Sequence, residues 1–490
     1  MDRSTTARRR VVSLAAMATL TLVASAAQAQ FTWRGFEGTS QYNNFFLDGA
    51  FRPPDTMGAI GTTQYLETTN GSVTVYDRTS GAVLNRVGAN AFWTRLGQNG
   101  SAGDQRVLFD HYTNRWMAIG FCRNVNDVCI GVSDTADALG TWKSTKITAF
   151  PSGTADYPTL GMDDKGVYIG TNNFTPGFSG TSLFTIPKAD LFGGAPTVAN
   201  MSRFDTGNPP NTYGYAIQGA VNWQGNTTNK APILAASLLQ YDVHYYTVTG
   251  VNAPGATRSA VADLNVNLYT DNGRGRQPDT LPGQANNTSN RLVDTLDDRI
   301  SANVYQSNGK LYAVHTVTDQ GGSFTELRYY VVDAGTGALL SQGEISGGSF
   351  DYYQGAIAVN EFGDVVIGFN RSGSQTGDTN GDGKADGRIS FLARVLKDDG
   401  TGQLTQVGAD MLLRVSDVGD YRCGARTTVD TACRQRWGDY AAVTIDPNNH
   451  RNFWAIGEYA AEWADYGTQQ APLVRANWHT YIAEIAVVPE

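Results

Sequence analysis

The segment DQRVLFDHYTNRWMAIGF, at residues 104–121, contains the pattern that decides the fold. An acidic residue opens it, a short alternating run follows, the polar turn HYTN comes next, and an apolar run ends it. Alternation with a period of two, interrupted by a polar turn, is typical of an antiparallel hairpin. Six more segments follow the same plan, and they start near residues 55, 156, 218, 298, 353 and 438.

The seven copies predict a repeating all-β architecture. Their spacing of roughly 50 to 85 residues is suited to one four-stranded blade per copy, with insertions of variable length. In the second copy we expect strands at residues 105–110, 115–121, 128–133 and 142–147. The prediction is an all-β fold, a seven-bladed β-propeller of four-stranded antiparallel blades. A β-sandwich with long loops is the alternative, although sandwiches do not need so regular a repeat.

The last copy lacks a strand, which indicates how the ring closes. After residues 454–459 only one more strand follows, at residues 478–487. A propeller closes strongly when the missing outer strand comes from the other terminus. We therefore expect residues 31–46 to supply it, so that strands from both termini close a single domain at residues 30–490. Two polar stretches, about 251–291 and 373–387, are interpreted as inserted loops.

Composition supports this fold class and restricts the partners. The chain has 490 residues, 55 of them glycine, with 11% aromatic and only 17% charged residues, as in turn-rich β proteins. The formal net charge of -9 argues against nucleic acid as the main partner.

The N-terminus indicates export. Three arginines at residues 8–10 precede an apolar stretch at 11–26, and Ala-Gln-Ala follows at 27–29. This is the pattern of a signal peptide, so residues 1–29 are expected to be removed and the mature chain to have no membrane span. The protein would be secreted, periplasmic or on the cell surface, with a twin-arginine export route left open. A cytosolic protein with a hydrophobic N-terminal strand is the alternative.

Four cysteines agree with an oxidising compartment. Cys122 and Cys129 flank a polar turn, and Cys423 and Cys433 flank a polar loop. Both spacings suit a local disulfide. Zinc binding is the weaker alternative, because neither pair has a C-x-x-C spacing or a nearby histidine.

A calcium-loop pattern lies in the second inserted loop. Oxygen ligands recur at alternating positions, and Gly383 allows a tight turn. The twelfth position is Ile389 instead of glutamate, so the loop resembles extracellular calcium-binding repeats more than a complete EF-hand. We expect a structural Ca²⁺, and a solvated turn without metal is the alternative. The expected ligands are Asp378, Asn380, Asp382, Lys384 and Asp386.

Polar residues at the start of the inner strands form the second candidate site. If every copy points its first strand at a common channel, these residues gather at one end of it. Arg106, Arg299 and Arg436 would bind a carboxylate of the ligand. The other residues expected to bind substrate are Tyr157, Gln218 and Gln354, and the expected catalytic residues are Asp156 as acid and Asp439 or Tyr440 as base or nucleophile. Salt bridges between blades and turn caps are the alternative for at least half of this set.

The leading functional hypothesis is a monomeric glycan-directed protein. Its axial funnel would bind an acidic extracellular polysaccharide, with hydrolase and lyase chemistry both left open. The rival hypothesis is a non-catalytic surface or matrix propeller that serves in adhesion or assembly.

Several phrases carry a resemblance to a known family. RVLFDHYTNRWMAIGF, CIGVSDTADALGTW and RWGDYAAVTIDP resemble secreted bacterial β-propeller proteins related to sialidase/BNR-repeat folds. Residues 133–142 are similar to the Asp-box of those repeats, which is a structural hairpin. The final residues, VVPE at 487–490, resemble the start of a PEP-CTERM sorting tail. The resemblance implies a fold and export more than a reaction.

Overall fold

The computed structural model describes residues 31–99, 103–122, 125–206, 212–237, 241–270, 273–278, 292–422, 435–464 and 474–488. Within these ranges the chain forms strands and three short helices, α1 (Gln41–Phe45), α2 (Ala89–Arg95) and α3 (Lys188–Phe192). The all-β prediction is confirmed. No helix in the described part of the chain is both long and apolar enough to cross a bilayer.

The first four sheets follow the order of the sequence. Sheet 1 consists of β2 (Met57–Ile60), β3 (Gln64–Thr69), β4 (Ser72–Asp77) and β5 (Val83–Gly88). Sheet 2 consists of β6 (Arg106–Asp110), β7 (Arg115–Phe121), β8 (Asp127–Ser133) and β9 (Trp142–Thr148). Sheet 3 consists of β10 (Thr154–Asp156), β11 (Gly161–Met162), β12 (Gly166–Phe174), β13 (Phe178–Pro187) and β14 (Ser202–Asp205). Sheet 4 consists of β15 (Tyr215–Gly219), β17 (Lys230–Ala236), β18 (Val243–Thr249), β19 (Thr257–Arg258) and β20 (Ala262–Leu264).

Of the remaining sheets, sheet 6 again follows the order of the sequence, and the other three include strands from distant parts of the sequence. Sheet 5 consists of β16 (Val221–Asn222), β21 (Tyr269–Thr270), β24 (Tyr305–Ser307), β25 (Lys310–Asp319), β26 (Thr325–Asp333) and β27 (Leu339–Ile345). Sheet 6 consists of β28 (Asp351–Val359), β29 (Asp364–Ser372), β30 (Ser390–Asp398) and β31 (Leu404–Val415). Sheet 7 consists of β33 (Ala442–Ile445), β34 (Asn452–Ala464), β35 (Val474–Val487) and β1 (Phe31–Ser40). A small sheet consists of β22 (Arg274–Gly275), β23 (Val293–Asp294) and β32 (Gln435–Arg436).

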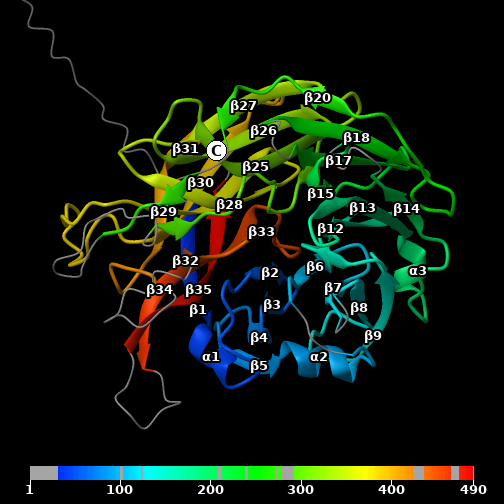
Figure 1. Ribbon diagram of the computed structural model, residues 1–490, viewed down its shortest axis with the longest axis horizontal. Coiled ribbons are helices and arrows are strands. Elements are labelled where there is room, and N and C mark those ends of the chain that lie inside the picture. Colours follow the sequence, from blue (N-terminus) through cyan, green and yellow to red (C-terminus); the bar gives the residue numbers. More distant parts are fainter. Residues whose placement is uncertain are drawn as a thin grey trace, which may run out of the picture.

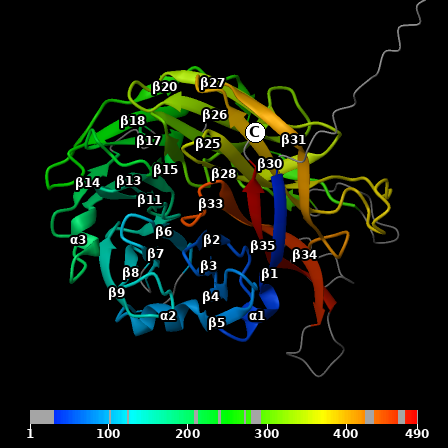
Figure 2. The ribbon, with the colours of Figure 1, turned by 180° about the vertical axis from the view of Figure 1, so that it is seen from behind.

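The sheets follow one another around a common centre, as Figures 1 and 2 show from opposite sides. Strands such as β2, β6 and β33 lie nearest the centre, and β5 and β9 lie at the outside. This arrangement of antiparallel four-stranded sheets confirms the β-propeller prediction. The count of seven blades stays a prediction, because the small sheet is an eighth sheet in the described residues.

The ring is closed by strands from both termini. β1 pairs antiparallel with β35, from Phe31 opposite Val487 to Glu37 opposite Tyr481. β35 in turn pairs with β34, so β1 is the outer strand of sheet 7. The predicted closure is confirmed, and it leaves β35 paired on both sides instead of as an open edge.

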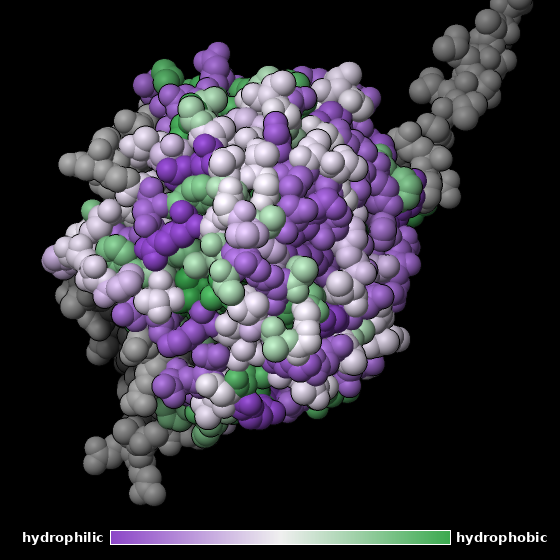
Figure 3. Space-filling view, turned by 90° about the vertical axis from the view of Figure 1, so that its right-hand side faces the viewer, coloured by the Kyte–Doolittle hydropathy of each residue, from purple (hydrophilic) through white to green (hydrophobic). Residues whose placement is uncertain are grey.

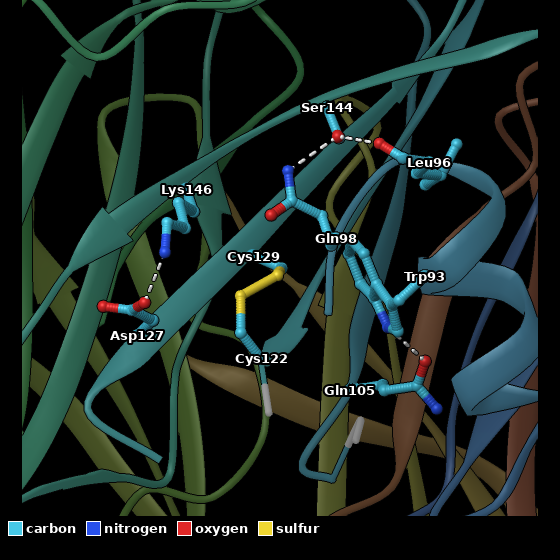
Figure 4. Close-up of a disulfide and its surroundings, with 9 residues drawn as sticks. All are labelled: Trp93, Leu96, Gln98, Gln105, Cys122, Asp127, Cys129, Ser144 and Lys146. Atoms are coloured by element: carbon cyan, nitrogen blue, oxygen red, sulfur yellow. Dashed lines mark hydrogen bonds and ion pairs between the residues drawn. A yellow bond between two sulfur atoms is a disulfide. The ribbon is translucent and has the colours of Figure 1, made fainter. Parts of the chain in front are cut away.

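The boundaries of sheet 2 agree closely with the sequence prediction. β6, β7, β8 and β9 each begin and end within one residue of the expected strands. The predicted Cys122–Cys129 disulfide joins the end of β7 to β8, with the Cα atoms 5.5 Å apart (Figure 4). Cys423 and Cys433 lie outside the described residues, as do residues 1–29, so both of those predictions stay predictions.

The core lies between neighbouring sheets. Their facing side chains form apolar clusters, and Trp116, Trp437 and Trp454 are among the largest fully buried side chains. On the face in Figure 3, polar and apolar residues are interspersed, and the apolar ones form only small groups. The apolar surface of the blades is therefore mostly used for packing one sheet against the next.

Candidate functional site

Five residues at or near the start of inner strands share an uncommon backbone conformation. Their φ angles lie between 50° and 55°, in the left-handed region that side chains other than glycine rarely adopt. Each such residue costs on the order of 1 kcal/mol or more, and surrounding contacts must hold it in place. The five residues are Asp55, Asp104, Tyr157, Ala216 and Gln354.

A side chain from the preceding sheet supports three of these residues. The Asn70 side chain accepts a hydrogen bond from the Asp104 backbone N–H at 2.9 Å. The Asn172 side chain does the same for Ala216 at 2.8 Å, and the Thr316 hydroxyl for Gln354 at 3.1 Å. The strained starts of the inner strands are therefore also the points where neighbouring blades are joined.

Two aspartates make the same kind of link with their carboxylates. Asp104 accepts the backbone N–H of Tyr157 at 3.2 Å, which joins sheet 2 to sheet 3. Asp55 accepts the backbone N–H of Asp439 at 3.1 Å, which joins sheet 1 to the start of sheet 7. Asp55 was not among the predicted site residues, although its place at the start of the first copy was a usable signal.

Arg106 is a structural arginine. Its side chain is buried and donates to the backbone carbonyls of Pro158 at 3.2 Å and Ser301 at 2.9 Å. The guanidinium carbon lies 3.6 Å from the ring centroid of Tyr440 and 5.3 Å from that of Tyr157. Cation–π contacts and backbone carbonyls thus surround the charge that was predicted to hold a ligand.

Arg299 is also buried, and it forms a fork with a nearby carboxylate. Its Nε and one terminal nitrogen each lie 2.6 Å from an oxygen of Asp297. The same terminal nitrogen donates to the Tyr215 hydroxyl at 3.0 Å, and the guanidinium lies 4.2 Å from the Tyr157 ring. Burial alone would raise the pKa of Asp297, but the charge and hydrogen bonds of Arg299 lower it, so the pair stays ionised.

Arg436 is the most accessible of the three predicted arginines. It belongs to β32 in the small sheet, and its side chain is 37% exposed. A terminal nitrogen lies 2.6 Å and 2.7 Å from the two carboxylate oxygens of Asp439. The backbone carbonyl of Arg436 accepts the Tyr421 hydroxyl at 2.7 Å, which fixes the strand beneath the ion pair.

Tyr440 is fully buried, and the structure offers no access to it from solvent. Burial, and then the charges of Asp104 and Asp55, raise the pKa of Tyr440 well above 10. Its hydroxyl has no hydrogen-bond partner among the described residues. The neighbouring Tyr157 hydroxyl donates to the Asp439 carbonyl at 2.9 Å. Both tyrosines therefore remain protonated at neutral pH.

Several carboxyl groups gather around these arginines. Burial, and then the negative charges of Asp156 and Asp439, raise the pKa of Asp104 to about 7. Burial also raises the pKa of Asp55, with which Asp104 shares a hydrogen bond. Burial raises the pKa of Asp156, although Arg299 opposes the shift. Carboxyls with raised pKa values often mark functional sites, but links between blades perturb pKa values as well.

The two predicted glutamines lie deeper in the fold. Gln218 is fully buried and donates to the Ile300 carbonyl at 2.8 Å. Gln354 donates to the Tyr440 carbonyl at 3.2 Å and to Glu458 at 3.1 Å. Burial raises the pKa of Glu458 well above its usual value. The sequence prediction did not include Glu458, because nothing in its strand marks it as a neighbour of Gln354.

The predicted calcium loop is an exposed turn between β29 and β30. The two carboxylate oxygens of Asp378 accept the N–H groups of Gly381 and Gly383, each at 2.8 Å. The Asp386 carboxylate accepts the hydroxyl of Thr379 at 2.8 Å. Within the described part of the chain, no group of three or more histidine, cysteine or acidic side chains is arranged to hold a metal ion. Calcium binding stays a prediction.

The opposite end of the inner strands is nearly filled by side chains. A cavity of about 10 Å³ lies there, close to the room that one water needs. His111 stacks on Trp223 with ring centroids 4.1 Å apart, and His450 packs edge-on against the same indole at 5.4 Å. This cavity has room for about one water, whereas the end with Asp104, Asp156, Arg436 and Asp439 presents a partly exposed guanidinium, so that end is the candidate site. We call it the axial face.

Comparisons with known proteins add little beyond the fold. No protein-family model and no curated protein matches the sequence. Among solved structures, the chain is similar to the WD40 repeats of RRP9, at 9% identity and a TM-score of 0.45, over 93% of this chain and 97% of that one. It is also similar to a protein of unknown function from Dyadobacter fermentans, at 10% identity and a TM-score of 0.39, over 93% and 99% of the two chains. Extracellular domains 1–2 of Drosophila Semaphorin 1b match at 9% identity and a TM-score of 0.40, over 93% and 86%.

All three TM-scores are below 0.5, so the propeller description rests on the sheet topology of this chain. The resemblances to sialidase-type repeats and to a PEP-CTERM tail receive no support from these comparisons and stay predictions.

Proposed function

We propose that this protein is an extracellular, monomeric, non-catalytic β-propeller that binds a polysaccharide at its axial face. The observation that carries the proposal is the pairing of Arg436 and Asp439 at an accessible position, with Asp156 close enough for their charges to interact. A guanidinium and carboxylates held side by side offer fixed donors and acceptors, which the adjacent hydroxyl groups of a sugar can satisfy. The export pattern of residues 1–29 and the Cys122–Cys129 disulfide support an extracellular location.

The contacts of the deeper residues favour binding over catalysis. A general base or nucleophile must come within hydrogen-bond reach of the substrate, and Tyr440 is fully buried beneath Arg106. Arg106 and Arg299 already have protein partners. Tyr440, Arg106 and Arg299 therefore already stabilise the joints between blades, and the surface that remains, with Asp156, Arg436 and Asp439, is suited to recognition.

The balance of charge at the axial face favours a neutral polysaccharide. Asp104, Asp156, Asp297 and Asp439 contribute carboxyl groups, and Arg436 is the only one of the three predicted arginines with an exposed guanidinium. Asp297 and Asp439 are already paired with Arg299 and Arg436, and burial raises the pKa of Asp104 and Asp156. None of the three arginines is therefore both exposed and free of a carboxylate to hold a uronate. The sequence alone predicted an acidic ligand because the partners of Arg106 and Arg299 were not visible in it. An acidic polysaccharide remains the second candidate, supported by the exposure of Arg436.

The test is a binding panel of purified protein with neutral polysaccharides (a mixed-linkage glucan and a galactan) and acidic ones (polygalacturonate and alginate). Affinity electrophoresis reports binding, reducing-end and ultraviolet assays report cleavage, and light scattering reports the oligomeric state. Asp156→Asn and Arg436→Met alter the axial face. Lys143→Gln is the matched control, because it removes an exposed charge on β9 of sheet 2.

We expect at least one neutral polysaccharide to retard the migration of the wild type. Asp156→Asn and Arg436→Met should each weaken the affinity at least fivefold, and Lys143→Gln should leave it unchanged. Product formation that Asp156→Asn abolishes would show an enzyme. Binding of the acidic polymers alone, lost in Arg436→Met, would favour the second candidate. Binding of no polysaccharide would refute the proposal.

A further inference from the structure

A second, larger cavity lies away from the axial face, between sheets 1 and 2. Its volume is about 240 Å³. We call it the α2 pocket, because α2 and the residue after it form one wall. β3, β4 and β5 supply another wall, and the β8–β9 hairpin supplies the third. The lining residues are Leu66, Val73, Val75, Asn85, Val87, Phe92, Arg95, Leu96, Ala138, Leu139, Gly140, Thr141 and Trp142.

The wall made by α2 is fixed by hydrogen bonds to sheet 2, which Figure 4 shows. The Ser144 hydroxyl on β9 donates to the Leu96 carbonyl at 2.6 Å and accepts from the Gln98 amide at 2.8 Å. The Trp93 indole N–H donates to the Gln105 side chain at 3.1 Å. A site whose walls are held in this way does not have to be ordered by its ligand, which favours binding.

The hairpin wall is also fixed. The Trp142 indole N–H donates to the Ala138 carbonyl at 2.9 Å. Asp137 accepts hydrogen bonds from Gln64 at 2.8 Å and from the Leu139 N–H at 2.9 Å. The carboxylate of Asp137 therefore already has partners within the protein.

The lining combines apolar side chains with polar groups, among them Asn85 and Thr141. Leu66, Val73 and Val75 are buried members of the hydrophobic core, and no charged side chain lies among them. Arg95 lines the pocket from the last turn of α2 and is exposed. Its Nε makes one long hydrogen bond, 3.5 Å to the Ala91 carbonyl, and no acidic side chain in the described ranges pairs with it. The pocket thus combines a buried apolar patch, a partly polar lining and one exposed cationic side chain.

We propose that the α2 pocket binds a small amphiphilic carboxylate, with the apolar body inside and the carboxylate on Arg95. If each non-hydrogen atom of a ligand takes about 30 Å³, the volume of one water, the pocket of about 240 Å³ holds about eight such atoms. Octanoate has a chain of that length. An apolar cavity of about 150 Å³ is already enough to bind benzene. This site does not depend on the proposal for the axial face.

The experiment titrates purified protein with octanoate and with octan-1-ol, by calorimetry and by tryptophan fluorescence, because Trp142 lies in the wall. Arg95→Gln removes the cation. Leu139→Trp blocks the mouth from a residue that is 44% exposed, so the fold tolerates it. Val73→Phe fills the interior, and circular dichroism checks its folding. Lys143→Gln, on β9, is the control for the loss of a partly exposed charge near the pocket.

We expect saturable binding of one octanoate, about tenfold tighter than octan-1-ol because of the charge-assisted contact. Arg95→Gln should lower the affinity for octanoate to that for octan-1-ol. Leu139→Trp should lower the affinity for both ligands, and Lys143→Gln should change neither affinity. Equal affinity for acid and alcohol in the wild type would refute the anionic contact. Absence of saturable binding, or binding that survives Leu139→Trp and a folded Val73→Phe, would refute the site.

Discussion

Replacing Asp104 with asparagine tests the carboxyl cluster at the axial face. In the wild type this side chain accepts the Tyr157 N–H and lies among Asp55, Asp156 and Asp439. An asparagine keeps an oxygen for the Tyr157 N–H and cannot ionise. The variant therefore resembles the protonated wild type at every pH.

The sign of the effect follows from the raised pKa. Asp104 has a pKa near 3.8 when unfolded and about 7 when folded, so between these values the folded state retains a proton that the unfolded state has lost. The contribution of Asp104 to the stability of the wild type therefore falls as pH rises from about 4 to about 7, and does not change further above that. The largest effect is on the order of 4 kcal/mol, from about 1.4 kcal/mol per pKa unit.

The assay is thermal unfolding at pH 4, 6 and 8. An unfolding entropy of about 2.1 cal/mol/K per residue over 490 residues means that a change of 1 kcal/mol in stability shifts the unfolding temperature by about 1 °C. Asp104→Asn should match the wild type at pH 4 and unfold about 4 °C higher at pH 8. Asp134→Asn is the control, because Asp134 forms a partly exposed ion pair with Lys143 and such pairs contribute little. A variant that is less stable than the wild type at pH 8, or an equal gain at pH 4 and pH 8, would refute the reasoning.

Three further predictions concern the frame. Replacing Cys122 and Cys129 by alanine should lower stability by about 2–3 kcal/mol, given the short loop that the disulfide closes; an unchanged denaturant midpoint would contradict this. Calcium should raise the unfolding temperature, a chelator should reverse the rise, and Asp382→Asn should abolish it. An unfolding temperature of the wild type that calcium does not change would show a solvated turn without metal. Deleting residues 31–40 should expose the edge of β35 and cause aggregation, which a peptide of that sequence should reverse; a soluble, equally stable deletion variant would contradict the closure.

The sequence was sufficient for those parts of the fold that depend on local pattern. Sheet 2 follows from alternation and turns within residues 104–148, so its strands could be placed almost to the residue. The hairpins after Asp77 and Asp333 are alike because each aspartate accepts the N–H groups two and three residues ahead. The closing role of β1 followed from counting strands. The last copy has too few strands for a four-stranded blade, so the missing strand has to come from the N-terminal end of the chain.

The roles of the axial residues could not be derived in the same way. Arg106 donates to a carbonyl 195 residues away, and Asp55 accepts an N–H 384 residues away. Such partners exist only once the ring has closed. The α2 pocket was invisible for a related reason: it is the space that two sheets leave when their side chains pack, and no motif encodes a gap.

The most direct test of the axial binding face is carbodiimide labelling of surface carboxyls, with and without the polysaccharide that binds, followed by mass spectrometry. Ligand should protect Asp156 and Asp439 and leave the labelling of exposed Asp205 unchanged. Protection confined to carboxyls away from Asp156 and Asp439, or no protection under saturating ligand, would contradict the account.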